Sequence, residues 1–76
     1  MNETTIKQTW RLVEAGCPEV SLRMDGHHVT PEPLPLGKLW DIAHKLELEF
    51  DFPLELTSNE LVEELVTIIE DHYHGN

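Results

Sequence analysis

Five histidines are the residues of this chain that most directly suggest chemistry, because imidazole is a common metal ligand. They are His27, His28, His44, His72 and His74. On a strand, His27 and His28 would point to opposite faces, and on a helix His72 and His74 would not face each other. This spacing predicts no metal site and no cofactor. A metal- or pH-responsive binder that uses the histidines stays as a second alternative function.

Nucleophilic and acid–base chemistry finds little support in the sequence. Cys17 is the single cysteine, which excludes an internal disulfide, and no residue pattern near it indicates a partner base. Glu63 and Glu64 are adjacent, so on a helix they would diverge by about 100° and could not share a proton. The four glycines are isolated and form no phosphate-binding loop. A chain of 76 residues also buries only one small core. We therefore expect a protein that is not an enzyme.

Negative charge is the most informative feature of the composition. The chain has 15 acidic and 5 basic residues, with a formal net charge of −10. Residues 1–31 contain four acidic and three basic side chains, whereas residues 32–76 contain eleven acidic and two basic ones. The negative field therefore belongs to the C-terminal part. Four of its carboxylates share the same parity along the chain: Glu47, Glu49, Asp51 and Glu55.

This row of carboxylates would lie along one face of a strand, and three of its members would also stack on a helix. One interpretation is a docking site for a basic partner, since complementary charge speeds association and selects partners. The alternative is a solvated face that keeps the chain soluble and protects an edge strand. Direct nucleic-acid binding and an anionic membrane surface are both disfavoured by the charge. No apolar run reaches the roughly 20 residues of a membrane span.

Two tryptophans add a possible contact site to this charged face. Trp10 and Trp40 lie on or beside predicted apolar stripes, which favours packing in the core. Tryptophan is also enriched at binding hot spots, so an exposed one would mark a partner site. We expect Trp40 to accompany the carboxylate row. In a chain this small, helix stripes could also complete their burial across a homodimer.

The first predicted element covers residues 6–15. Thr5 and Gln8 fit a capping box, in which both side chains bond free backbone N–H groups at a helix start. The apolar residues at helical spacing are Ile6, Trp10 and Val13. The segment also alternates in polarity, so a strand remains the alternative.

A β-hairpin is predicted around Asp25-Gly26, because this dipeptide between alternating residues favours a type I′ turn. That turn pairs Met24 with His27, Arg23 with His28, and Leu22 with Val29. The face expected to meet the core consists of Val20, Leu22, Met24 and Val29. The opposite face consists of Ser21, Arg23, His28 and Thr30. After it, the prolines of residues 31–35 predict an extended path over the surface.

The remaining chain predicts two helices with an extended segment between them. From Leu36 the apolar residues Leu36, Leu39, Ile42, Ala43 and Leu46 recur at helical spacing. Strict alternation then predicts an extended segment to about Leu56, and Pro53 would make it an edge strand. Thr57 and Glu60 form a second capping box, and the helix is expected to run to Tyr73. Its predicted stripe is Leu61, Leu65, Ile68, Ile69 and His72.

Together these patterns predict a small single α+β domain over residues 1–76. Its order is helix, β-hairpin, helix, extended or edge strand, helix. The leading function is a non-catalytic protein-interaction module or inhibitor, located in the cytoplasm, whose acidic half docks on a basic partner surface. In composition the chain resembles small acidic proteins of phages and other mobile elements, including some anti-CRISPR inhibitors. The resemblance implies an inhibitor that mimics nucleic-acid phosphates. The first alternative is a homodimeric structural or accessory subunit that associates through apolar helix faces.

Overall fold

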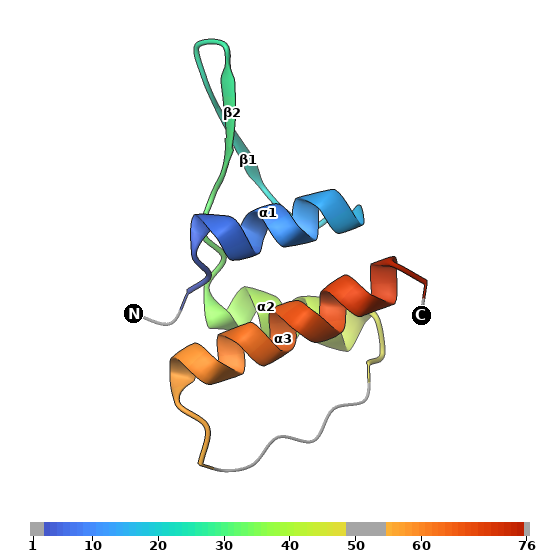
Figure 1. Ribbon diagram of the computed structural model, residues 1–76. Coiled ribbons are helices and arrows are strands. Elements are labelled where there is room, and N and C mark those ends of the chain that lie inside the picture. Colours follow the sequence, from blue (N-terminus) through green and yellow to red (C-terminus); the bar gives the residue numbers. More distant parts are fainter. Residues whose placement is uncertain (1–2, 49–54, 76) are drawn as a thin grey trace.

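In the part of the chain that the structure describes, this small α+β domain has three helices and one antiparallel hairpin, in the predicted order of helix, hairpin, helix, helix (Figure 1). The computed structural model describes residues 3–48 and 55–75. The elements are α1 (Ile6–Ala15), β1 (Leu22–Asp25), β2 (His28–Pro31), α2 (Leu36–Lys45) and α3 (Ser58–Tyr73). The predicted edge strand falls largely on residues 49–54 and so lies outside the described part.

The predicted capping boxes are present at the starts of α1 and α3. At α1 the Thr5 hydroxyl accepts a hydrogen bond from the Gln8 backbone N–H, and the Gln8 side chain accepts one from the Thr5 N–H. Thr57 and Glu60 make the same reciprocal pair at α3. These bonds satisfy backbone donors that have no partner inside the helix. The helix prediction for residues 6–15 is therefore confirmed over the strand alternative.

The core lies between the helices, where α3 packs against both α1 and α2. Its fully buried large aliphatic side chains are Leu12, Leu39, Ile42, Val62, Leu65, Val66 and Ile69. The α2 stripe is as predicted. The α1 prediction is wrong, because Thr9 and Leu12 are buried while Ile6 and Trp10 are exposed. The helix has apolar residues on two sides, and α3 covers only one of them.

The α3 stripe is also centred differently from the prediction. Val62 and Val66 belong to the buried face, whereas His72 is exposed. Both α1 and α2 contact α3, so its buried face is wide enough to include the neighbouring valines. His72 lies in the last turn, beyond most of this packing.

The hairpin turn lies one residue further along the chain than predicted, which shifts the strand pairing by two residues. Met24 pairs with Val29 and Asp25 pairs with His28, which leaves Gly26 and His27 in the turn. Gly26 has φ +66°, and Glu47 is the one described non-glycine residue with positive φ. Glycine at the first central position with a normal second residue is the pattern of a type II′ turn. A type I′ turn would need positive φ at both central positions.

The hairpin projects from the helical body and does not pack its apolar face on the core (Figure 1). Leu22, Met24 and Val29 lie on one face, because Met24 is opposite Val29 and two positions from Leu22. All three are exposed, and Met24 retains 75% of its accessible surface. Val20, the fourth residue of the predicted core face, does pack against the core, so the prediction is confirmed for Val20 and wrong for Leu22, Met24 and Val29. Among the described elements, α1 contacts β2 and no helix contacts β1.

The proline segment after the hairpin is partly interior. Leu34 is buried in the core, contrary to the predicted surface path. Its N–H donates to the Thr4 hydroxyl at 2.7 Å, and its C=O accepts from the Thr4 N–H at 2.8 Å. Thr4 and Thr9 share a further hydroxyl hydrogen bond of 2.7 Å. These buried polar groups are therefore satisfied, and they tie the segment to α1.

Candidate interaction surfaces

Arg11 joins α1 to α3 through two carboxylates. Its Nη1 donates to Glu63 at 2.7 Å and its Nη2 to Glu70 at 2.8 Å, with a longer contact to the Thr67 hydroxyl. Glu63 and Glu70 are seven residues apart, so α3 presents both on the same side. Gln8, one turn before Arg11, donates to Glu63 as well. This cluster uses two of the acidic side chains of α3 for structure.

Hydrogen bonds from Arg11 set the ionisation of this cluster. They hold the pKa of Glu63 below its usual range, with the Gln8 amide as the second cause. They likewise lower the pKa of Glu70. The two carboxylates in turn raise the already high pKa of the Arg11 guanidinium. All three groups therefore remain charged at neutral pH.

The two lysines of residues 32–76 form ion pairs with a carboxylate of residues 1–31. Lys38 and Lys45 both approach the same oxygen of Glu19, at 3.6 Å and 3.3 Å. The two lysines are seven residues apart on α2, so they lie on the same side of that helix. This side faces Glu19 in the segment that follows α1. They are the two basic residues of positions 32–76 and pair with a carboxylate outside that region. The negative charge of residues 32–76 is therefore not neutralised by its own lysines.

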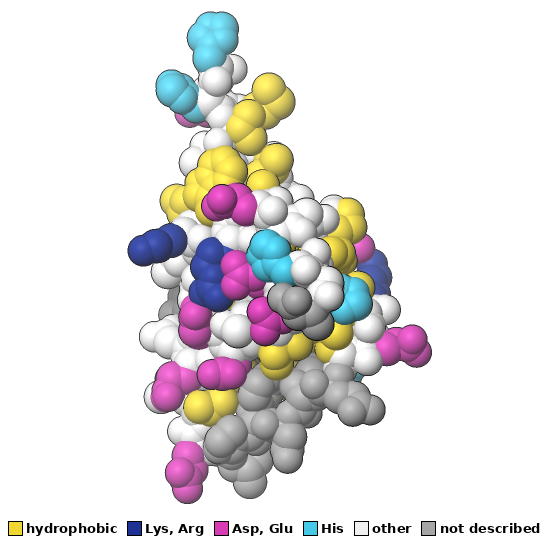
Figure 2. All heavy atoms as spheres, turned by 45° about the vertical axis from the view of Figure 1, so that its right-hand side comes forward, with side chains coloured by type: hydrophobic (Ala, Val, Ile, Leu, Met, Phe, Trp, Pro, Cys, Tyr) yellow, Lys and Arg dark blue, Asp and Glu magenta, His cyan; other side chains and the backbone are white. Residues whose placement is uncertain are grey.

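Five of the exposed carboxylates outside these ion pairs make up what we call the acidic surface. Its members are exposed and take part in no ion pair among the described residues; one directly follows α2, and the others lie on α3 or just before it. They are Glu47, Glu55, Glu60, Glu64 and Asp71. Glu60 has a second role as the capping residue, and its hydrogen bonds with Thr57 lower its pKa. Figure 2 shows acidic side chains over the helical body below the hairpin.

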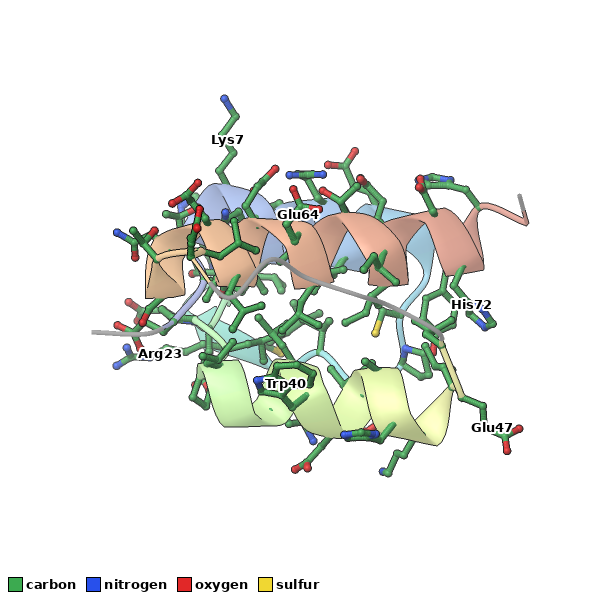
Figure 3. All side chains as sticks on the ribbon, turned by 90° about the horizontal axis from the view of Figure 1, so that it is seen from below. Lys7, Arg23, Trp40, Glu47, Glu64 and His72 are labelled. Carbon is green, nitrogen blue, oxygen red and sulfur yellow. The ribbon has the colours of Figure 1, made fainter. Side chains whose placement is uncertain are left out.

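The residues of the predicted partner site do not all lie together in the structure. Glu47 and Glu55 are exposed, and Figure 3 shows Glu47 directed away from the helices. Glu49 and Asp51 lie outside the described residues. Trp40 is half-buried, packs against the core and stacks on His44 with ring centroids 6.1 Å apart. Glu60, Glu64 and Asp71 were missed as site candidates, although their spacing of four and seven residues places them on one side of a helix.

Glu47 has an unusual backbone. It follows α2 with φ +56°, while the N–H of Glu47 bonds the C=O of His44 and the N–H of Leu48 bonds that of Ala43. This pair of bonds is the Schellman ending of a helix, in which the left-handed residue is usually glycine. Gly16 occupies the equivalent position after α1, with φ +95°. The chain therefore holds a glutamate where glycine would be less strained.

Histidine and cysteine do not form a metal cluster in the described part of the chain. Within residues 3–48 and 55–75, no group of three or more His, Cys, Asp or Glu side chains is placed to hold an ion. His27 and His28 lie at the hairpin tip, where Figure 2 shows histidine side chains. Cys17 is a buried free thiol. Its backbone N–H bonds the C=O of Leu12 at the end of α1, which fits a structural role.

A second surface combines the hairpin with α1. The exposed large hydrophobic residues in the described part of the chain all belong to these elements: Ile6, Trp10, Leu22, Met24 and Val29. We call this the hairpin–α1 surface. Figure 2 shows hydrophobic side chains running down the hairpin to the helical body. The exposed Trp10 was predicted to mark a partner site if it was not in the core.

Comparisons with known proteins add no function to these surfaces. None of the helices among the described residues combines the length and apolar character that crossing a membrane requires. No protein-family model matches the sequence, and no curated protein or solved structure is significantly similar to it.

Proposed function

We propose that this protein is a non-catalytic interaction module of the cytoplasm whose acidic surface docks on a basic protein partner. The observation that carries the proposal is the distribution of ion pairs. Lys38 and Lys45 neutralise Glu19, and Arg11 neutralises Glu63 and Glu70. The exposed carboxylates of the acidic surface remain available for an external cation.

The backbone at Glu47 supports the same conclusion. A non-glycine residue in the left-handed region costs about 1 kcal/mol or more and is often found at functional sites. Gly16 shows that this chain uses glycine for the same helix ending elsewhere. A glutamate at position 47 is therefore explained better by its exposed charge than by stability.

A basic partner that normally binds nucleic acid fits this chemistry, because carboxylates would occupy positions of phosphates. An inhibitor of the phage or mobile-element type is one form of this function. The buried free thiol of Cys17 is compatible with a reducing compartment.

The experiment is capture of partners from the native host followed by association kinetics at low and high salt. The variant combines Glu47→Gln, Glu55→Gln, Glu64→Gln and Asp71→Asn, and leaves the capping residue Glu60 intact. Its matched control exchanges four acids away from this surface: Glu3→Gln, Glu14→Gln, Glu32→Gln and Asp41→Asn. The test variant should associate more slowly than the control, because the net charge of the two is the same and only the position differs.

Two substitutions at Glu47 separate the effect of its charge on association from the effect of its backbone strain on stability. Glu47→Gly should stabilise the domain by about 1 kcal/mol through relief of backbone strain, while it slows association. Glu47→Gln should slow association without that gain. Equal association rates for the test and control variants, together with salt-independent affinity, would refute the docking role of the acidic surface.

A further inference from the structure

Among the described residues, no strand pairs with the outer edge of β1. Ser21 accepts a hydrogen bond from the Glu32 N–H, which identifies Ser21–Glu32 as a hydrogen-bonded pair of the ladder. Hydrogen-bonded and non-bonded pairs alternate in an antiparallel ladder. Leu22–Pro31 and Met24–Val29 are therefore non-bonded pairs. The N–H and C=O groups of Leu22 and Met24 must point away from β2.

The edge of β2 is protected, in contrast to that of β1. Pro31 lies at an outward-facing position, so β2 lacks one main-chain donor on its free side. β2 also contacts α1, whereas β1 contacts none of the described helices. β1 contains no proline and no lysine that would block a neighbour. An added strand can therefore pair with β1 and not with β2.

We propose that a second copy of this chain pairs with β1 through a two-fold axis at Met24, giving a four-stranded antiparallel sheet. In this register Met24 is opposite the partner's Met24, and both use outward-facing backbone groups. Arg23 is opposite the partner's Asp25, and the symmetry repeats this ion pair. Opposite charges across an antiparallel pair are favourable.

Charge distinguishes this register from its neighbours. Outward-facing groups must meet outward-facing groups, so the axis moves in steps of one residue along β1. An axis at Arg23 would place two arginines directly opposite each other. An axis at Asp25 would place two aspartates directly opposite each other. Both arrangements oppose like charges, which is destabilising. An axis at Leu22 would place Arg23 opposite the uncharged Ser21 of the partner. Among axes at the four residues of β1, the Met24 register alone pairs Arg23 with an acid.

Self-pairing also brings the exposed apolar side chains of the two copies side by side. An isolated two-stranded hairpin is marginally stable in water, and additional strands stabilise it. Leu22, Met24 and Val29 of both copies would lie on the same face of the new sheet, where they shield one another. The arrangement is closed, since each copy uses its single open edge. The acidic surface stays free on both copies, so this inference does not depend on the proposed function.

Sedimentation of the full chain from about 1 µM to about 1 mM tests the proposal, with the mass expected to rise from 8.8 kDa toward twice that value. Met24→Pro removes an outward donor and leaves the hairpin ladder intact. Val29→Pro makes the same change on the opposite strand and serves as the matched control. Met24→Pro should weaken association by about tenfold or more, because both copies lose a main-chain donor. Val29→Pro should not weaken it.

Charge exchange tests the register independently of proline. Asp25→Arg should weaken the dimer, and adding Arg23→Asp should restore it. In the parent, amide exchange at Leu22 and Met24 should slow as concentration rises, while that at Val29 stays constant. Two chains of charge −10 repel each other, so added salt should not weaken the dimer. Binding of a basic partner to the acidic surface should weaken with salt, which separates failure of one proposal from failure of the other.

Three outcomes would overturn the inference. One is a monomer at every concentration, which would leave the β1 edge without this occupant. Another is an equal effect of the two proline variants, which would place the contact elsewhere. The third is a dimer whose Leu22 and Met24 amides exchange as fast as in the monomer.

Discussion

Replacing Arg11 with glutamine should lower stability at neutral pH and have a smaller effect in acid. The Arg11 side chain is 31% exposed, and its partners Glu63 and Glu70 are 47% and 22% exposed. Solvent screening limits the more exposed Glu63 pair to about 0.5 kcal/mol, and the less exposed Glu70 pair contributes about 1 kcal/mol. The expected loss is therefore about 1.5 kcal/mol, equivalent to roughly 6–12 °C in Tm for a domain of this size.

The pH dependence follows from the direction of the pKa shifts. Arg11 lowers the pKa of Glu63 and Glu70 in the folded chain below the ordinary value of 4.5. Their stabilising effect is complete above the ordinary pKa and is lost as pH falls through the lower folded values. The difference between parent and variant should therefore shrink as the pH falls below about 4.5.

Urea unfolding followed by circular dichroism, at about pH 7 and about pH 3, measures this difference. Lys7→Gln is the matched control, because Lys7 lies on the same helix, is exposed and forms no ion pair among the described residues. Figure 3 shows Lys7 directed away from the helices. A loss that is equal for both variants, or that persists undiminished at pH 3, would refute the role assigned to Arg11.

Two further predictions concern the core and the hairpin. Leu65→Asp should abolish folding, because a charge would replace a fully buried side chain, whereas the same exchange at the exposed Leu22 should change the free energy of unfolding by less than about 1 kcal/mol. Similar urea midpoints for the two variants would contradict the described core. Gly26→Val should cost about 1–2 kcal/mol of hairpin stability, because φ at this position is +66°. Amide exchange should increase in β1 and β2 and stay unchanged in α3, and unchanged hairpin exchange would contradict the turn.

The sequence predicted features that depend on neighbouring residues better than those that depend on distant ones. Thr5 and Thr57 marked the helix starts correctly, because a capping box is complete within four residues. The hairpin was placed correctly, but the sequence leaves a choice between Asp25-Gly26 and Gly26-His27 as the central turn residues, which changes the pairing by two residues. Backbone geometry at Gly26 decides that choice, and it is not encoded in polarity alternation.

Burial and ion pairing depended on distant residues and were less predictable. Ile6 and Trp10 have helical spacing like core residues, and their exposure follows from where α3 lies. Arg11 meets Glu70 across 59 positions, which no local pattern reveals. The exposure of Glu47 and Glu55 was predictable from alternation, whereas the left-handed backbone of Glu47 was not.

The packing of α1 on α3 has a consequence for how this chain reaches its fold during synthesis. α1 is made first, and α3 is made last among the described elements. Because α3 contributes buried residues on both sides of the core, neither α1 nor α2 has its apolar face covered before α3 emerges. Contacts between elements so far apart in sequence form slowly. The nascent chain therefore leaves Leu12 and Leu39 without their α3 partners until α3 has left the ribosome, and a ribosome paused before α3 would hold a chain that cannot complete its core.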